Sequence, residues 1–495
     1  MDNQGEYRNF ADSLKARQSE LADQPTAPVD LTNDYCLVEP QYSAKNTFTR
    51  NQTISFSIFL IAALLGLFLH WEKTIIFGSL FFSGFYLAVA LFRAAVLANV
   101  DISKPTPLKA TVRLENKTYV ILVALYKEET QIADLIRAID RLKWTRGRKL
   151  VCLVCEQNDP ATISAIRKTQ LPPGFHLMIV PHGSLKTKPR ALNYALKQVS
   201  GDYLVIYDAE DRPHPNQLIE AATRFYTSPE HLVCLQAPLA IDNVKESFLS
   251  RMFAIEYDTL FSGILPALTR WKAPMPLGGT SNHFQFQKLV SAGGWDSYNV
   301  TEDADLGIRL ARKGMYCGVL VSPTFEEAPA ALSPWLKQRT RWIKGWMQTL
   351  LVHTRNPLAT ALDMGITKYL MFHLVLTAVV ISVLVHPLFL MAFGFQMINY
   401  FSNGPQTTYD IAITAISAFN LVAGYSTYAL LAYAVQTSKP NTQSILWILL
   451  LPLYWVLLSI AGWRALYKIF QEPHHWEKTP HTSEKRKANN RQSAT

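Results

Sequence analysis

Acidic residues gather at three places where a strand is predicted to end. Tyr126 and Glu128 follow the first of these strands, Glu156 follows the second, and residues 208–211 read Asp-Ala-Glu-Asp after the fourth. Carboxylate oxygens are hard ligands that suit Mg²⁺ or Mn²⁺ holding a diphosphate, and further carboxylates can bind a ribose or a base. A single acid could simply cap the next helix. Acids at three strand ends together favour a binding site.

A second acidic motif lies further along the chain, where Thr301, Glu302 and Asp303 precede a predicted helix. Its alternative role is structural, with Thr301 as the N-cap residue of that helix.

Residues 338–342 read Gln-Arg-Thr-Arg-Trp and lie in a predicted helix. Trp335, Trp342 and Trp346 recur there at spacings of seven and four, which places them on one helical face. Such a face is typical of an amphipathic helix at a membrane surface, with Trp at the bilayer interface. That role and a functional role are compatible.

The elements that must position these residues belong to an α/β domain. Between about residues 104 and 357, short β-branched runs alternate with charged helical stretches. We expect strands at residues 119–125, 150–155, 176–180, 203–207 and 231–236, and helices near residues 129–142, 189–199 and 214–227. This alternation predicts a mostly parallel sheet, in which ligands bind beyond the carboxyl ends of the strands. The acidic residues follow those ends.

The composition indicates a membrane protein with a soluble part. Of 495 residues, 49% are hydrophobic and only 17% are charged, against roughly 25% charged in soluble proteins. Five apolar stretches are long enough to span a bilayer, at residues 54–70, 75–97, 369–395, 411–435 and 445–466. The first two are separated by so few residues that they predict a hairpin. Since five spans would place the two termini on opposite sides of the membrane, either one span is missed or the fifth is partly re-entrant or interfacial.

The distribution of Lys and Arg predicts the orientation. These residues flank the first two spans and fill the segment after Trp463, whereas the loop at residues 396–410 has none. Under the positive-inside rule, both tails and the α/β domain are therefore cytoplasmic. The net charge of +10 is explained by this topology and by attraction to the membrane surface, not by nucleic-acid binding.

The five cysteines form no even disulfide framework. Cys152 and Cys155 lie three residues apart in a predicted strand, whose alternation points them to opposite faces. We expect reduced core residues rather than a zinc site or a redox pair.

The order of these motifs resembles family 2 glycosyltransferases, in the membrane-integrated branch of cellulose and hyaluronan synthases. The matching motifs are Asp208-Ala209-Glu210 for D-x-D, Thr301-Glu302-Asp303 for T-E-D, and residues 338–342 for Q-x-x-R-W. The pattern departs where Lys127 replaces Asn, Glu156 replaces Asp, and Glu210 replaces the second Asp of D-x-D, with Asp211 adjacent. The resemblance implies a GT-A-like α/β domain between N-terminal and C-terminal membrane helices.

By this resemblance, Asp303 is the catalytic base. The residues implied to bind the donor are Tyr126, Glu128, Glu156, Lys188, Asp208 and Arg341. Those implied to bind the acceptor are Glu302, Gln338 and Trp342. Asp208 with Glu210 or Asp211 is implied to hold Mg²⁺ or Mn²⁺.

The implied domains are a flexible cytoplasmic tail (1–50), a transmembrane hairpin (51–100), a cytoplasmic GT-A catalytic domain (104–330), an interface helix (331–358), a transmembrane region (366–470) and a basic cytoplasmic tail (471–495). The implied function is transfer of a sugar, with inversion, from a UDP-sugar donor into a β-linked polysaccharide. The implied donor is UDP-glucose or a UDP-N-acetylhexosamine, and the polysaccharide is secreted through the protein's own membrane helices. The expected location is a plasma membrane, which in a bacterium is the inner membrane. Whether the protein forms a homo-oligomer or has an export partner is left open. Two alternatives are a non-processive transferase acting on a lipid-linked acceptor and an inactive subunit serving assembly or transport.

Overall fold

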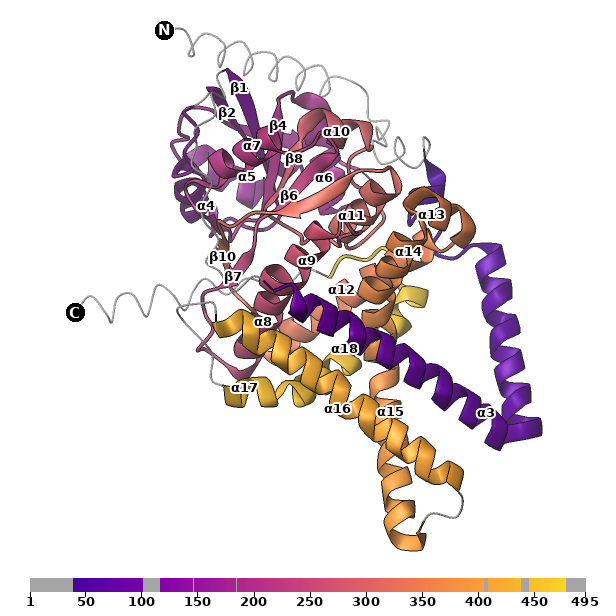
Figure 1. Cartoon of the computed structure of the whole chain (residues 1–495). Helices are drawn as coiled ribbons and strands as arrows, with labels where there is room; N and C mark the ends of the chain where they lie inside the picture. Colours follow the sequence, from indigo (N-terminus) through magenta and orange to yellow (C-terminus); the bar gives the residue numbers. More distant parts are fainter. Residues whose placement is uncertain are drawn as a thin grey trace.

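The computed structural model describes residues 39–100, 116–145, 147–183, 185–404, 408–437 and 445–477. Its α/β part is built on a seven-stranded sheet with the order β3-β2-β1-β4-β8-β6-β9 (Figure 1). The strands are β1 (Lys117–Leu125), β2 (Gly147–Glu156), β3 (Phe175–Val180), β4 (Tyr203–Tyr207), β6 (Leu232–Gln236), β8 (Asn282–Gln285) and β9 (Tyr316–Val319). Neighbouring strands are parallel except that β8 is antiparallel to both β4 and β6. The five predicted strands and the mostly parallel sheet are confirmed, whereas β8 and β9 were not expected.

Helices cover both faces of this sheet, which explains why β1 and β4 are nearly continuous apolar runs. One face packs against α4 (Ile132–Asp140), α5 (Pro160–Lys168) and α7 (Gln217–Thr227). The other face packs against α6 (Lys188–Gln198), α8 (Phe248–Thr259), α9 (Leu265–Arg270) and α10 (Phe286–Ser291). The core of this second face continues into the C-terminal helices through Ala432, Ile448, Leu451 and Tyr454. The sheet and the apolar helices therefore share one core.

Three short elements form a second sheet next to the carboxyl ends of the main strands. They are β5 (Arg212–Pro213), β10 (Thr324–Glu326) and β7 (Leu239–Ile241), in the order β5-β10-β7. Because β5 directly follows residues 208–211, its pairing with β10 holds the end of that acidic loop. The sequence analysis did not foresee this sheet, whose strands are too short to show a period of two.

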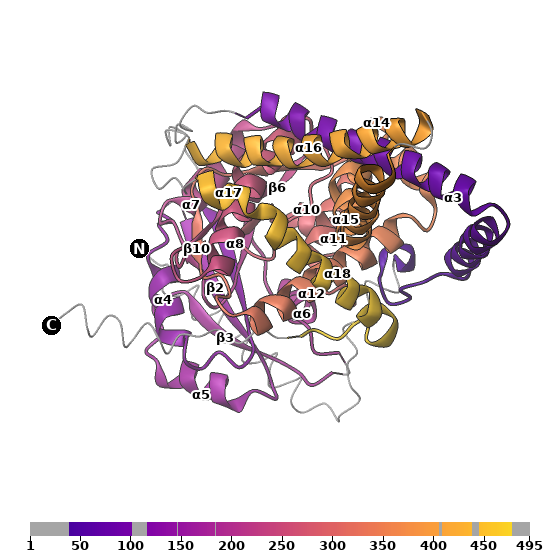
Figure 2. The same ribbon diagram turned by 90° about the horizontal axis from the view of Figure 1, so that it is seen from below.

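Three helices are long and apolar enough to cross a membrane within the part of the chain that the structure describes. The first is α3 (Arg50–Ala98) and the third is α16 (Thr408–Thr437). The second is one continuous helix made of α14 (Ile366–Phe372), a π-helical turn (His373–Thr377) and α15 (Ala378–Asn403). In both views α3 and α16 run side by side (Figures 1 and 2). The chain ends in α17 (Ile445–Leu449) and α18 (Leu451–Gln471).

Element α3 consists of two helical limbs that bend sharply at His70, as the prediction of two limbs joined by a tight turn requires (Figure 1). That these limbs cross a membrane stays a prediction. α3 is helical throughout its 49 residues apart from His70, whose φ of −146° and ψ of 54° mark a kink. The stretch that was expected to form the turn, residues 71–74, is helical. At 1.5 Å per residue, the limbs at residues 50–69 and 71–98 are about 30 Å and about 42 Å long, so each is long enough to span the roughly 30 Å of a hydrocarbon core.

The predicted tails also differ where the structure describes them. Residues 1–38 and 478–495 lie outside the described residues, but residues 39–49 and 472–477 pack on the protein through specific hydrogen bonds. Cys152 and Cys155 lie in cores on opposite faces of the sheet, as predicted. These two and the other described cysteines, Cys234 and Cys317, are buried and free.

Helix α12 (Leu332–His353), which contains residues 338–342, packs against α18 and also contacts α11 (Glu302–Arg312). The contact with the start of α11 depends on Gly345. A Cβ atom at this position would lie 2.3 Å from Oγ1 of Thr301 and 2.5 Å from its Cγ2, where two atoms cannot both fit. The absence of a side chain lets α12 approach the residue that precedes Glu302 and Asp303.

We therefore expect Gly345→Ala to destabilise the protein by about 1–3 kcal/mol, the usual cost of overpacking a filled contact. Thermal unfolding in detergent checks this. Gly424→Ala is the matched control, because a Cβ at this helical glycine has nothing within 4 Å. Equal unfolding midpoints for the two variants would contradict the packing argument.

Candidate active site

One cavity of about 1930 Å³ runs along the carboxyl ends of the main strands and on between the apolar helices. Its wall contains every residue that the sequence analysis assigned to a site: Tyr126, Glu128, Glu156, Lys188, Asp208, Glu210, Asp211, Glu302, Asp303, Gln338, Arg341 and Trp342. The fold thus brings together residues spread over more than two hundred positions of the chain. Their individual roles remain predictions.

The loop after β4 supplies three carboxyl groups. Asp211 is almost fully buried, and its Oδ2 accepts hydrogen bonds from the backbone N–H of Asp208, at 2.7 Å, and from the hydroxyl of Thr280. Its Oδ1 is buried and has no hydrogen-bond partner. Burial and then the negative Asp208 and Glu210 raise the pKa of Asp211 well above its ordinary value. Asp211 therefore shapes the loop and leaves one oxygen available.

Lys188, at the start of α6, is the positive centre of this wall. Its ammonium pairs with Oδ1 of Asp208 and donates to the carbonyl oxygen of Gly279 at 2.6 Å. Burial alone would lower the pKa of Lys188, but Asp208, Glu302 and Asp303 outweigh it and raise the pKa. Lys188 is therefore a cation that connects the loop after β4 with the start of α11.

Glu302 and Asp303 occupy the first turn of α11, where the helix dipole favours negative charge. Oδ1 of Asp303 accepts a hydrogen bond from the backbone N–H of Ala304 at 2.7 Å. Burial, and for Glu302 also the charge of Asp303, raises the pKa of Glu302 to about 8 and that of Asp303 to about 6. At neutral pH this favours a protonated Glu302 beside an ionised Asp303, a separation typical of acid and base pairs.

The predicted capping role of Thr301 is only half right. Thr301 is the N-cap residue of α11, but its side chain makes no capping hydrogen bond to the helix. Instead its backbone N–H donates to Oδ1 of Asn299 at 3.0 Å.

Helix α12 presents Gln338, Arg341 and Trp342 to the cavity. Arg341 interacts electrostatically with Glu302, Asp208 and Asp303, and its guanidinium lies 5.0 Å from the ring centre of Trp476. It is the second cation of the carboxylate wall.

The ring of Trp342 is stacked on that of Tyr257 with an interplanar angle of 16°, and the guanidinium of Arg339 lies 4.7 Å from the centre of the Trp342 ring. Arg339 is itself held by Glu256, at 2.7 Å. The orientation of the Trp342 ring is therefore set by buried neighbours.

The predicted membrane-facing row of three tryptophans is wrong for Trp335. This side chain is fully buried, against Tyr454 of α18 and Arg339, and does not line the cavity. The spacing placed it on the correct helical face, but α8 and α18 cover that end of the helix. Trp335 is a core residue.

An ion pair and a turn with a left-handed backbone conformation lie at the end of the cavity nearest β1 and β2. Glu156 forms an ion pair with Arg190 at 3.0 Å, and burial raises the pKa of Glu156 despite that partner. Lys127 has a φ of 55°, and its N–H donates to Oδ2 of Asp159 at 2.5 Å. Since this left-handed conformation is several-fold enriched in Asn, it explains why the family pattern has Asn where this chain has Lys127.

Sequence reasoning missed two residues of the wall. Glu326, at the end of β10, lies among Asp211, Glu210 and Asp208, and these neighbours together with burial raise its pKa well above the ordinary value. Trp476 reaches the cavity from the segment after α18. Neither belongs to a motif that stood out, although Glu326-Glu327 is an acidic pair between two predicted elements.

The wall contains a cluster of carboxyl groups but, among the described residues, no preformed metal cage. Within the residues that the structure describes, no group of three His, Cys, Asp or Glu side chains is arranged to hold an ion. The unpartnered Oδ1 of Asp211 and the nearby Asp208 and Glu210 are hard oxygen donors. Mg²⁺ is commonly bound by one or two carboxylates together with substrate phosphates and water. The residues fit a cation that is shared with a diphosphate.

Comparison with known proteins places these residues in a family. The model described as "Glycosyl transferase family group 2" matches residues 203–461, more than half of the chain, and "Glycosyl transferase family 2" matches residues 120–285. A beta-monoglucosyldiacylglycerol synthase of Synechocystis is 29% identical over 291 residues, covering 55% of this chain and 58% of that protein. A poly-beta-1,6-N-acetyl-D-glucosamine synthase of Staphylococcus aureus is 28% identical, covering 48% of this chain and 56% of that protein.

The chain thus spans less than two thirds of the length of these relatives. Among solved structures, a mannosyltransferase of Pyrobaculum calidifontis in complex with GDP-Man and Mn²⁺ is 17% identical, with a TM-score of 0.43 over 70% of this chain and 97% of that one. This likeness carries no argument about the donor or the metal. The two family models together include every residue of the wall from Tyr126 to Trp342. The chain therefore belongs to glycosyl transferase family 2.

Proposed function

We propose that this protein transfers hexosyl units from a UDP-sugar, with inversion, into a β-linked polysaccharide that passes along its own membrane helices. The observation that carries the proposal is the continuity of the cavity. The same cavity that contains Asp208 and Asp303 is lined further on by side chains of α3, α15, α16 and α18. Aromatic and polar groups occur among them, including Tyr425, Trp455 and His386. Flat rings beside polar groups suit a carbohydrate chain.

In the proposed reaction, Asp303 accepts the proton of the acceptor hydroxyl as that oxygen attacks the anomeric carbon. The bond from the anomeric carbon to the diphosphate oxygen breaks, and the diphosphate leaves with the negative charge. Lys188 and Arg341 stabilise that charge, and a protonated Glu302 can donate a hydrogen bond to the acceptor. Trp342 and Gln338 line the acceptor side. Bound Mg²⁺ or Mn²⁺ would add positive charge at the diphosphate, with Asp208 and Glu210 or Asp211 as its ligands.

A second candidate is transfer of one sugar to a lipid acceptor. It is favoured by the likeness to a protein named beta-monoglucosyldiacylglycerol synthase and by the apolar helices that line the far part of the cavity. An inactive subunit is disfavoured, because the proposed base and both cations are present in one cavity.

Product analysis separates the two candidates. Membranes containing the protein are incubated with each radiolabelled UDP-sugar, and the product is sized and tested for extraction into organic solvent. We expect one donor to give a water-soluble polymer. A labelled lipid of fixed mass would support the glycolipid function, and no incorporation from any UDP-sugar would reject the proposed donor class.

The role of Asp303 predicts a defined pH dependence. Because Asp303 must be ionised to accept a proton and its pKa is raised to about 6, turnover should fall as the pH drops through that value. Asp303→Asn should reduce turnover by roughly 10² or more with donor binding nearly intact, because the amide keeps the shape and cannot take the proton. UDP titration and initial rates between pH 5 and about 8 check both. A variant retaining more than about a tenth of the activity would exclude Asp303 as the base.

The proposed metal ligands predict a metal-dependent donor affinity. Asp208→Asn should weaken UDP binding much more with Mn²⁺ or Mg²⁺ than with EDTA, because the lost oxygen acts through the cation. Comparison of Glu210→Gln with Asp211→Asn in the same titration identifies the second ligand. Full activity in EDTA would reject the metal role.

A further inference from the structure

The residues before the first membrane helix form a strap across the catalytic half of the molecule. We call residues 39–48 the strap. Ala44 and Ser43 are almost fully buried. Arg355, just after α12, donates hydrogen bonds to the carbonyl oxygens of Pro40, Gln41, Ser43 and Asn46. Glu39 forms an ion pair with Lys313 at 2.8 Å. A segment held at this many points is part of the folded structure.

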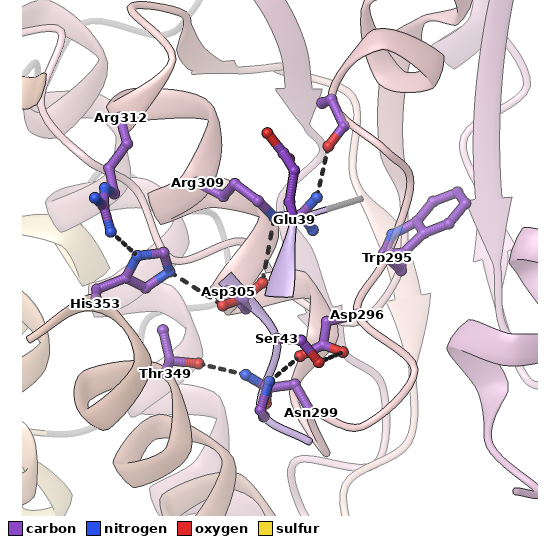
Figure 3. Close-up of polar contacts among 12 residues, drawn as sticks. Glu39, Ser43, Trp295, Asp296, Asn299, Asp305, Arg309, Arg312, Thr349 and His353 are labelled. Atoms are coloured by element: carbon purple, nitrogen blue, oxygen red, sulfur yellow. Dashed lines mark hydrogen bonds and ion pairs between the residues drawn. The ribbon is translucent and has the colours of Figure 1, made fainter. Parts of the chain in front are cut away.

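The central contact of the strap is with Asp296, as Figure 3 shows. Oδ2 of Asp296 accepts the backbone N–H of Ala44 at 2.5 Å. Oδ1 accepts the hydroxyl of Ser43 at 3.1 Å and the backbone N–H of Tyr298 at 3.1 Å. Burial and then the nearby Asp305 raise the pKa of Asp296 to about 6, so this group is mostly ionised at neutral pH and can accept all three bonds. One oxygen therefore serves the strap alone.

Asp296 begins the loop that leads to the proposed base. Within this loop, Nδ2 of Asn299 donates to Oγ1 of Thr349, and the N–H of Val300 donates to Oε1 of Gln348, both on α12. Glu302 and Asp303 follow at once. The loop thus binds α12 through Asn299 and Val300 and the strap through Asp296, and the strap also contacts α12. The position of the loop therefore depends on both neighbours.

A second polar cluster fixes α11 to α12 next to this loop (Figure 3). Nε2 of His353 lies 3.1 Å from Oδ1 of Asp305, and Nε of Arg309 lies 3.5 Å from Oδ2 of the same carboxylate. Both Asp305 and His353 are fully buried. This cluster holds the helix that follows the base, while Asp296 holds the loop that precedes it.

We propose that the strap is a positioning element for the catalytic loop and that Asp296 is the positioning residue that joins them. The proposal rests on the proposed role of Asp303 as the base. The strap ends at residue 48, and the capping residue Thr49 and then α3 follow directly. The proposal therefore implies that the placement of α3 also affects the position of Asp303.

The test is Asp296→Asn, which acts on the strap selectively. The Asn oxygen can still accept from Ser43 and Tyr298, but its NH₂ group would face the N–H of Ala44, donor against donor. Arg355→Met removes a second anchor of the strap, which among the described residues makes no hydrogen bond to the loop, and also removes a positive charge that acts on Asp296. The matched control is Asp202→Asn, since Asp202 accepts the backbone N–H of Thr118 at 2.8 Å at the opposite end of the sheet.

We expect Asp296→Asn and Arg355→Met each to lower kcat by about tenfold while the KM for the donor changes less than about twofold, because misplacing a reacting group costs turnover rather than donor affinity. Asp202→Asn should leave kcat unchanged. Hydrogen exchange should become faster at residues 297–303 in the two strap variants, and this readout does not need activity.

Three results would overturn the proposal. These are unchanged exchange at residues 297–303 in both strap variants, wild-type kcat in both, or a loss of kcat in Asp296→Asn that Arg355→Met does not share. The last would mean that Asp296 acts only within its own loop. If Asp303→Asn keeps full activity while the strap variants speed up exchange, the proposed base fails and the positioning contact stands.

Discussion

The balance between carboxyl groups and cations in one cavity wall is the constraint on which the rest of the structure depends. Lys188 interacts electrostatically with Asp208, Glu302 and Asp303, and Arg341 interacts with these three and with Glu210. Asp211 and Glu326 lie beside the same carboxyl groups. Removing charge from water is costly, so burial raises the pKa of Asp211, Glu302, Asp303 and Glu326, and each of these groups keeps its proton to a higher pH than a free carboxyl group does. A bound cation would release those protons, which links metal binding to pH.

This constraint explains how the surrounding elements are arranged. Lys188 comes from the start of α6 and Arg341 from the middle of α12, so two different helices supply the cations that act on Asp208, Glu302 and Asp303. α12 can approach because Gly345 leaves room for Thr301. The same helix packs on α18, and the core of the sheet continues into the C-terminal helices. A shift of the C-terminal helices would therefore move Arg341 relative to the carboxylates.

Much of the fold followed from local patterns. The strands and helices on both sides of Asp208 were predicted because buried parallel strands are apolar throughout and helices have a different period. β8 and β9 were missed because each is only four residues long. β8 also begins with the polar residues Asn282 and His283 and therefore resembles a loop. The polar residues at 70–74 predicted that α3 is divided into two limbs, and the structure places the bend between the limbs at His70.

For the site, the sequence by itself determined which residue types stand at the strand ends and in the T-E-D and Q-x-x-R-W motifs, and all of these line one cavity. Only the tertiary structure decided which neighbours they meet. Trp335 became a core residue because α18 covers it, Glu156 became the partner of Arg190, and Glu326 joined the acidic wall from a three-residue strand. A local pattern determines which way a side chain points from its own element, but burial, pairing and pKa depend on residues that approach from distant parts of the chain.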